Sequence, residues 1–475
     1  MKNNLKYLIL SLLSISAFES CSFLEVENYG KSDTDAFFAE LDGLRTAREG
    51  LYSTTYDLCE YLYQYAELAG DCVQASSIII DTDGSYYQYN FLTDTSTAME
   101  LTAAGYIWKN GYVVLSNVNT LLSYIGSLKE NYPNDTDEIE RIAAEALYLR
   151  AFAHFALVSC YAQPYNYTED ASHIGIPIVD HIISPKETIV RSSVAKVYEQ
   201  ILADLNDAHK TLGDTAPRDA HYVSGMACNA LLARIYLHMG NYPEAEACAN
   251  RVISSIELTP AEQYQAMFTG QELGSEAIFR LSGAYASKRL RTFYDYESPN
   301  FIPATDFLKT FRNADDIRLT LMKAPDGQTA CMKYYDTTNA ALEDKFYHIT
   351  VSRASEMYLA RAEALCMQNK LEDAAADIAS LRARALNVTK EEAAFNYNNN
   401  QRELLRLIKE EYQKEMCFEG HRFFDLARWN DDIVRSEDTN SIVKKLDYPD
   451  YRFALPIPRV EMDANPDMEQ NEGYN

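Results

Sequence analysis

Tryptophan, paired metal ligands and basic residues are all scarce in this sequence. Only 2 of its 475 residues are tryptophan, and its 9 cysteines form no CxxC or CxxH motif, so a structural zinc site is not expected. Asp and Glu outnumber Lys and Arg, 70 to 43, which argues against binding to nucleic acid or to an anionic membrane through a basic surface. The formal charge of −27 is typical of a well-solvated protein and identifies no ligand.

The N-terminal twenty residues differ from the rest of the chain. MKNNLK carries two lysines, the apolar run YLILSLLSISAF follows, and ES then precedes Cys21. The run is too short to span a bilayer, and this arrangement is typical of a secretory signal. We therefore expect residues 1–20 to be a signal peptide and Cys21 to be the acylated first residue of a bacterial lipoprotein. A plain secreted protein with an incidental cysteine is the alternative. Residues 21–475 are expected to form a single domain.

Helical periodicity dominates the chain after this segment. In TDEIERIAAEALYLRAFAHFALVSC, residues 136–160, apolar side chains recur at steps of three and four. SVAKVYEQILADLNDAHKTL, residues 193–212, has the same pattern. Several cysteines stand among Ala and Leu on such helix faces, which predicts buried thiols rather than disulfides. These cysteines are Cys160, Cys228, Cys248, Cys366 and Cys417.

An internal repeat is also present. The 26 residues from Cys228 align without gaps on those from Glu356, an offset of 356 − 228 = 128. Each unit predicts a helix, a tight Gly or Asn turn and a second helix, the tetratricopeptide-type pattern whose repeat is about 34 residues. Such units stack because one alone cannot bury its apolar face; two unrelated hairpins of similar composition are the alternative. Residues 72–100 and 281–350 lack periodicity and predict long loops with short strands, the usual place for binding residues.

Several motifs then occur in a fixed order. IWKNGYVVLSNVNTLL carries Trp108, Tyr112 and Asn117 on a W-x3-Y helix, EGHRFFDLARW occupies residues 419–429, and YRFALPIPRVEMDANPDMEQNEGYN ends the chain. Together with the signal and its cysteine, these motifs make the chain resemble the SusD/RagB family of outer-membrane lipoproteins of Bacteroidetes. The resemblance implies a mostly α-helical fold. It would be a solenoid of tetratricopeptide-like hairpins with an irregular, loop-rich ligand-binding region.

The resemblance also implies a role. Members of the family are held by lipid in the outer membrane, facing the cell exterior, as a lid on a SusC-like TonB-dependent transporter. They capture oligosaccharides, or peptides in the RagB branch, pass them into the transporter, and do no chemistry on them. We therefore expect a glycan-binding lipoprotein and not an enzyme. A peptide-binding protein of the same transporter system and a tetratricopeptide adaptor for another protein's tail are the alternatives.

The segment EYQKEMCFEGHRFFDLARWN, residues 411–430, gathers acids, a thiol, a histidine and two arginines. A hydrolase would need a base beside a nucleophile in a cleft, whereas here the charged groups alternate with large apolar side chains. We predict a helix up to Gly420 and then a packed corner in which Arg422 and Arg428 hold Glu415, Glu419 or Asp425. The residues assigned to this structural corner, with no catalytic role, are Glu415, Glu419, His421, Arg422, Asp425, Arg428 and Trp429.

Tyrosine is the aromatic residue available for sugar binding, because Trp108 and Trp429 are both expected in the core. The chain has 35 tyrosines, and each offers a flat apolar face and a hydroxyl group. Clusters in the irregular segments supply the candidate ligand-binding residues, which are Tyr86, Tyr87, Tyr89, Tyr294, Tyr296, Tyr334 and Tyr335. The alternative is that these rings only pack the loops onto the helices.

Cofactors have little support in the sequence. No helical histidine has a second type of metal ligand four residues away. Asp81, Asp83 and Asp94 have the oxygen chemistry that calcium prefers, but DTDG is only a fragment of the EF-hand spacing. We therefore predict no cofactor, with these aspartates as the one candidate for a structural calcium site.

Overall fold

The computed structural model describes residues 34–76, 82–91, 103–184, 186–269, 274–282, 289–295, 297, 299–334 and 347–474. The expected signal peptide and Cys21 lie outside these residues, so both stay predictions. The described residues are mostly helical, with few and short strands, which confirms the predicted fold class. The structure also describes eight cysteines, all of them free and buried, which confirms the prediction of core thiols.

The helices are α2 (Thr34–Phe38), α3 (Leu41–Leu68), α4 (Thr82–Gln88), α5 (Ala103–Asn131), α6 (Thr136–Tyr161), α7 (Val194–Leu212), α8 (Gly225–His238), α9 (Tyr242–Ile253), α10 (Tyr264–Thr269), α11 (Arg289–Phe293), α12 (Thr305–Leu308), α13 (Ala354–Met367), α14 (Leu371–Leu386), α15 (Gln401–Met416), α16 (Arg422–Arg428) and α17 (Arg459–Ala464). The strands are β1 (Val73–Ala75), β2 (Ala277–Leu281), β3 (Phe301–Pro303), β4 (Ile349–Arg353), β5 (Ile433–Val434) and β6 (Lys445–Leu446). They form the antiparallel pairs β1–β3, β2–β4 and β5–β6.

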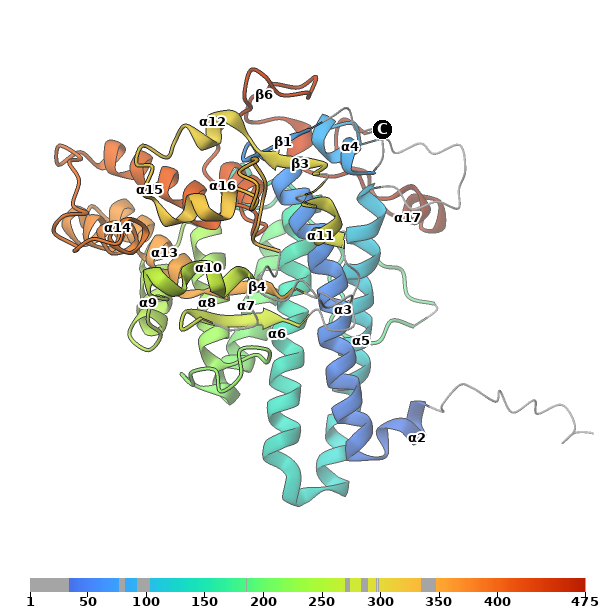
Figure 1. Ribbon diagram of the computed structural model, residues 1–475. Helices are drawn as coiled ribbons and strands as arrows, with labels where there is room; N and C mark the ends of the chain where they lie inside the picture. The colour runs from blue at the N-terminus through green and yellow to red at the C-terminus, as the bar shows by residue number, and fades with distance from the viewer. Residues whose placement is uncertain are drawn as a thin grey trace, which may run out of the picture.

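Three long helices, α3, α5 and α6, run side by side, and their lower ends project below the other helices (Figure 1). Small residues permit this close packing. A Cβ atom on Gly111 of α5 would lie 2.7 Å from the side chain of Leu157 on α6. Among the described residues, the segment Pro133–Tyr161 is long and apolar enough to cross a membrane, but 83% of its apolar stretch is buried inside the protein. It therefore serves as a central core helix.

The repeat appears as two stacked hairpins, α8–α9 and α13–α14, with α9 packed on α13. Their structural offset is one residue larger than the sequence alignment indicates, since α9 begins at Tyr242 and α14 at Leu371, and 371 − 242 = 129. The left-handed turn residues, Gly240 (φ 69°) and Asn369 (φ 62°), have this offset as well. The alignment of 128 is therefore wrong by one position. The sequence alignment paired identical residues, whereas the structure pairs the helix ends and the buried positions of α9 and α14.

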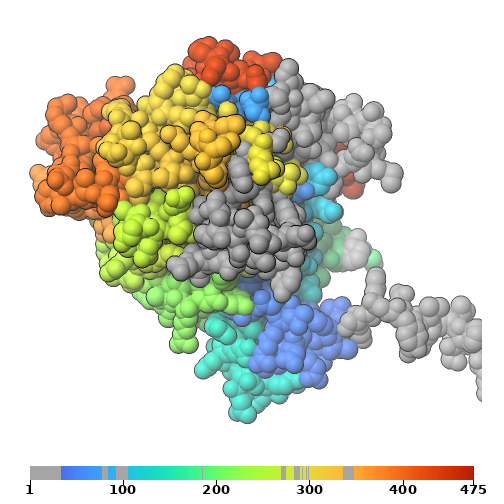
Figure 2. Space-filling view, in the orientation of Figure 1, coloured from blue at the N-terminus to red at the C-terminus, as the bar shows by residue number. Residues whose placement is uncertain are grey.

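The irregular segments come together at the upper end of α3. β1 lies in the first segment and β3 in the second, and Val73 pairs with Pro303. The first segment also contains α4, a short helix that the sequence pattern did not predict. In Figure 2, residues of the second segment, in yellow, spread over the surface above the green residues that include the hairpin α8–α9. These segments are therefore packed onto the helices over much of their length.

Candidate functional site

The corner residues Glu415 and Glu419 lie in a buried ion-pair network centred on Arg353. The guanidinium of Arg353, which has no exposed surface, donates to Glu276 at 2.7 Å, to Glu415 at 2.7 Å and to Glu419 at 2.8 Å. The remaining members of the network are Asp316, Arg318, Lys333, Arg384 and Glu411. Because these side chains come from distant parts of the sequence, the network fastens α14 and α15 to β2 and β4.

Electrostatics keep Glu415 and Glu419 ionised although both are buried. Burial by itself would raise the pKa of Glu415, but Arg384, Arg353 and Arg318 outweigh it and hold that pKa well below its usual value. The pKa of Glu419 is lowered in the same way, because Arg353 and Lys333 outweigh the effect of burial. A carboxylate held in this way accepts hydrogen bonds and is a poor proton donor.

The two arginines of the corner have other partners than most of those predicted. Arg428 does pair with Asp425, at 2.8 Å, but its other contact is with Glu363 of α13, at 2.6 Å. Arg422 pairs with Asp71, at 2.6 Å, and not with a carboxylate of its own segment. Glu363 also accepts a hydrogen bond from the indole of Trp429 at 2.9 Å. Glu363 and Asp71 are more than sixty residues away from these arginines, so no local pattern in the sequence predicts them as partners.

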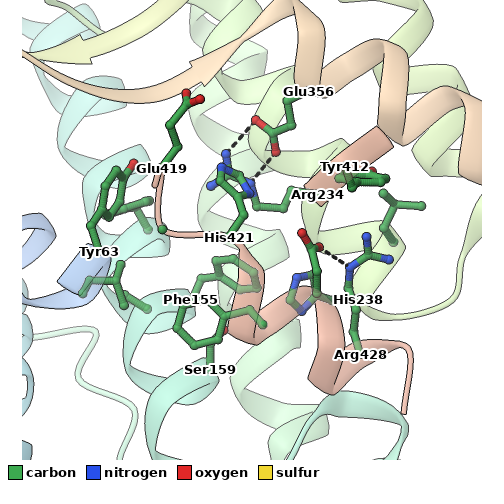
Figure 3. A pocket seen from close by; sticks show the side chains of 17 residues that line it. Tyr63, Phe155, Ser159, Arg234, His238, Glu356, Tyr412, Glu419, His421 and Arg428 are labelled. Carbon is green, nitrogen blue, oxygen red and sulfur yellow. Dashed lines mark hydrogen bonds and ion pairs between the residues drawn. The ribbon is translucent and has the colours of Figure 1, made fainter. Parts of the chain in front are cut away.

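A small cavity lies beside this corner, between α3, α6, α8 and the turn before α16 (Figure 3). His238 and His421 line it together with the ion pair of Arg234 and Glu356, which are 2.6 Å apart. Its volume is about 40 Å³, enough for a few water molecules but not for a sugar ring. Burial lowers the pKa of both histidines well below the ordinary value, so both are neutral at pH 7. The cavity is therefore a small internal space with a partly polar lining and not a ligand pocket.

Glu67 lies near this corner and carries a testable pH dependence. Burial raises its pKa to about 7, although it accepts a hydrogen bond from the backbone N–H of Gly420 at 3.0 Å. The unfolded chain ionises this carboxyl near its ordinary pKa, so Glu67 disfavours folding progressively as the pH rises from there to about 7. We expect this to cost up to about 3 kcal/mol of unfolding free energy, and Glu67→Gln to remove the loss.

Urea denaturation of the wild type and Glu67→Gln at about pH 5 and pH 8 measures this effect. The variant should gain stability relative to the wild type only at the higher pH. All other titrating groups cancel in the comparison of the two proteins. An equal difference at both pH values would mean that Glu67 is ionised in the folded protein throughout.

The candidate tyrosines are mostly core residues, which corrects the expectation that they form an open platform. Tyr86, Tyr87, Tyr89, Tyr294 and Tyr334 are between 0 and 6% exposed. The physical reason is that α4 and α11 fold back on α3. The hydroxyl of Tyr89 donates to the Ala69 carbonyl, and the Arg435 guanidinium covers the ring of Tyr87 at 4.5 Å. The hydroxyl of Tyr334 donates to the Phe418 carbonyl. Their ring faces are not available to a ligand.

The remaining candidate residues are ones whose side chains the structure does not describe. Tyr296 and Tyr335 are not among the described residues, and neither are Asp81 and Asp94. Asp83 lies in α4, but its side chain is not described. Both roles proposed for these residues, ligand binding and calcium binding, therefore stay predictions.

A different pair of tyrosines is both stacked and partly exposed. The rings of Tyr61 on α3 and Tyr106 on α5 are 4.8 Å apart, with an angle of 6° between their planes. The guanidinium of Arg289, at the start of α11, lies 4.4 Å from the centre of the Tyr61 ring. We call these three residues the tyrosine shelf. Arg289 lies over one face of the Tyr61 ring and Tyr106 over the other, so the outer face of Tyr106 is the stacking surface of the shelf.

The shelf is held in place by its neighbours. The guanidinium Nε of Arg289 donates to the side-chain oxygen of Gln64 at 2.5 Å, and its backbone N–H donates to Glu60 at 3.1 Å. The side chain of Asn110 on α5 donates to the carbonyl of Asp57 on α3 at 3.4 Å, which ties the two helices together beside the rings. The shelf is therefore built on two long helices and not on a loop tip, so its geometry is preorganised.

The helical repeat separates Tyr61 from three buried tyrosines of α3 but does not single it out, because Tyr65, four residues on and on the same side of the helix, is fully buried. Because successive residues of an α-helix are about 100° apart, Tyr56 and Tyr63 lie within about 40° of Tyr52 around the helix axis, and Tyr61 lies about 180° from it. Tyr52, Tyr56 and Tyr63 are all buried, whereas Tyr61 is partly exposed. The sequence-based candidates for ligand binding all lie in irregular segments, whereas Tyr61 lies in the long helix α3.

Comparison with known proteins shows matches along almost the whole chain. A family described as "Starch-binding associating with outer membrane" matches residues 22–237, and the "SusD family" matches residues 304–474. A relative named SusD-like protein P2, from Formosa agariphila, is 23% identical over 99% of this chain and 100% of its own length. SusD-like protein P38 from the same organism is 22% identical, over 99% of both chains.

Solved structures show the same fold. A SusD superfamily protein from Bacteroides thetaiotaomicron superposes with a TM-score of 0.79 at 27% identity, covering 91% of this chain and 99% of the other. A putative sugar binding protein from Bacteroides vulgatus also gives 0.79, at 25% identity, over 92% and 99%. The matches to both family regions, the relatives along the full length and the shared helical fold lead to one conclusion: the chain belongs to the SusD-like family.

Proposed function

We propose that this protein binds glycans through the tyrosine shelf. The single observation that carries the proposal is the stacked, partly exposed pair of Tyr61 and Tyr106, bordered by Arg289. The C–H groups on one face of a sugar ring pack well on an aromatic ring, because both surfaces are apolar and flat. Tyrosine hydroxyls and a guanidinium supply hydrogen bonds to the sugar hydroxyls at the edges of the rings. The "starch-binding" family description and the sugar-binding relative support the same ligand class.

The setting of the proposed function is the outer membrane, as the family description indicates. In this proposal, Cys21 is acylated after removal of residues 1–20, and the domain faces the cell exterior. It delivers captured oligosaccharide to a SusC-like TonB-dependent transporter. A lipid anchor fits the composition, because a protein with a net charge of −27 is repelled overall by an anionic membrane.

We propose further that the protein does no chemistry on its ligand. His238 and His421 are neutral and line a cavity of about 40 Å³, which is too small for a sugar ring. Glu415 and Glu419 are held ionised by their cations, so they are poor proton donors to a glycosidic bond, and Asp425, whose pKa burial raises, is paired with Arg428. Incubation with oligosaccharides should yield no new reducing ends.

Removing a ring of the shelf is expected to weaken glycan binding. Tyr106→Ala removes the stacking face and should raise the dissociation constant about tenfold, the equivalent of 1.4 kcal/mol. Tyr61→Ala removes the ring that supports Tyr106 and should raise the dissociation constant by less. Isothermal titration against a panel of soluble polysaccharides, with the wild type first, identifies the ligand and measures the change. Circular dichroism checks that each variant folds.

The matched control is Tyr167→Ala. Tyr167 is 43% exposed, and its ring contacts His173 in the connection between α6 and α7 and not a ring of the shelf, so its loss should leave glycan affinity unchanged. Glycan binding that is unaffected by both shelf substitutions would place the site elsewhere. Saturable binding of peptides from a protein digest, with no binding of any glycan, would support the peptide-binding alternative and overturn the proposal.

A further inference from the structure

Two histidines far apart in the sequence face each other at the edge of the β2–β4 pair. Nε2 of His221 lies 3.3 Å from Nδ1 of His348, and the two ring centres are 4.8 Å apart. Two imidazole nitrogens bound to one tetrahedral metal ion, each at about 2.0–2.1 Å, are separated by about 3.3 Å. The observed separation of the two nitrogens therefore matches that of two ligands of a single metal ion.

The fold holds both histidines in this arrangement. The backbone N–H of Arg280 in β2 donates to the carbonyl of Ala220 at 2.7 Å, which fixes the residue before His221. Leu281 of β2 pairs with Ile349 of β4, which brings His348 alongside. On the other side of His221, the ring of Tyr222 packs against Tyr52 at 5.4 Å. Backbone pairing and ring packing therefore place the two imidazole rings next to each other in the folded protein.

A carboxylate orients the ring of His221. Oδ1 of Asp219 lies 3.0 Å from Nδ1 of His221 and also accepts a hydrogen bond from the backbone N–H of His221 at 2.9 Å. With its proton on Nδ1, directed at Asp219, the ring presents the lone pair of Nε2 toward His348. Histidine ligands of metal ions commonly donate their other N–H to a carboxylate in this way, which fixes the tautomer and makes the ring a better ligand.

Access from solvent is available on the same side. The side chain of His221 is 25% exposed. Asp219 and Ala220 also line an open groove of about 380 Å³ between the turn before α8, the end of α9 and the start of β2. Neither histidine lines this groove, so the exposed part of His221 is the point at which a cation meets the pair.

We propose that Nε2 of His221 and Nδ1 of His348 form a binding site for a divalent transition-metal ion of the zinc, copper or nickel type, with Asp219 as the positioning carboxylate. Imidazole nitrogen suits these ions, whereas calcium and magnesium prefer oxygen ligands. Among the described residues no three His, Cys, Asp or Glu side chains are grouped for a metal ion, so water completes the coordination shell. His348 carries its proton on Nε2 in the metal-bound form.

The test is titration of the full-length mature protein with Zn²⁺, together with Cu²⁺ and electron paramagnetic resonance. We expect one saturable Zn²⁺ site per chain and a Cu²⁺ spectrum with nitrogen hyperfine coupling. His221→Ala and His348→Ala should each abolish that site, and Asp219→Asn should weaken it about tenfold, because it perturbs orientation and not a ligand. Excess Ca²⁺ should not compete.

His209→Ala is the matched control, because His209 also contacts an aspartate, Asp214 at 2.9 Å, but faces no second histidine. It should leave the Zn²⁺ stoichiometry and affinity unchanged. The proposal is overturned if His221→Ala and His348→Ala, both folded by circular dichroism, bind Zn²⁺ like the wild type, or if Ca²⁺ displaces Zn²⁺. Either result would mean that the acidic surface binds cations without this site.

Discussion

Arg353→Met is expected to lower the unfolding free energy by about 3–5 kcal/mol at pH 7, enough to abolish folding in a marginally stable protein. Methionine nearly fills the volume of the arginine stem, so a cavity is not the main cause. The loss of charge leaves Glu276, Glu415 and Glu419 facing one another without the cation that contacts all three. Removing one partner of a buried ion pair is costly because the remaining charge is no longer solvated by water.

The pH dependence distinguishes this mechanism from simple loss of packing. Without Arg353, the folded-state pKa values of Glu415 and Glu419 rise, so these groups take up protons more readily as the pH falls. In the wild type, by contrast, their lowered pKa values stabilise the fold above the ordinary carboxyl pKa, and this contribution is lost in acid. The difference in stability between the two proteins should therefore shrink from about pH 7 to about pH 4.

Urea denaturation followed by circular dichroism at both pH values measures this difference. Arg406→Met is the matched control, since Arg406 also pairs with two carboxylates, Glu403 at 2.8 Å and Glu410 at 3.2 Å, but its side chain is 50% exposed. Surface pairs contribute little, so this change should cost less than about 1 kcal/mol. Equal losses for Arg353→Met and Arg406→Met would contradict a structural role for the buried network.

Gly420→Ala is the second substitution with a large expected effect. Gly420 has φ of 78°, in the left-handed region, and a Cβ atom there would lie 2.5 Å from the ring of Tyr63. Tyr63 is 4% exposed, and its hydroxyl donates to the carbonyl of Thr350 at 2.8 Å, so the ring cannot move away without losing that bond. Backbone strain of about 1–2 kcal/mol and overpacking of about 1–3 kcal/mol should together lower the unfolding free energy by about 3 kcal/mol.

Gly240→Ala separates the two contributions. Gly240, in the turn between α8 and α9, has φ of 69°, but a Cβ atom there would have no neighbour within 4 Å. It should show only the strain, about 1–2 kcal/mol. Thermal and urea unfolding of both variants measures the difference, and a Gly420→Ala variant as stable as Gly240→Ala would show that the core around Tyr63 adapts freely.

Much of the scaffold could be predicted from the sequence because helices are local. The steps of three and four in residues 136–160 and 193–212 correspond to α6 and α7, and the repeated helical hairpins appear as α8–α9 and α13–α14. A helix is specified by residues within a few positions of one another, so its pattern is visible in the chain. The register between the hairpins was less visible, because a one-residue shift changes which side chains face the core but leaves the composition unchanged.

The candidate site was harder to predict for the opposite reason. Two cations that pair with the corner carboxylates, Arg353 and Lys333, are more than sixty residues away from them, and no local pattern pairs such groups. Tyr86 and Tyr87 follow a turn-like DG and look like loop residues, but α4 folds onto α3 and buries them. Tyr61 is also a tyrosine, but it is partly exposed. Composition alone does not distinguish the two.

The sequence by itself determined the helical hairpins, the buried thiols, the acidic surface charge and the family, because each depends on local periodicity, on composition or on motifs read in order. Only the tertiary structure decided which tyrosines face solvent, which cations neutralise the buried acids, and that His221 meets His348. These properties depend on which surfaces pack together. Packing joins residues hundreds of positions apart, and the free energy of burial is set by that contact and not by the neighbouring sequence.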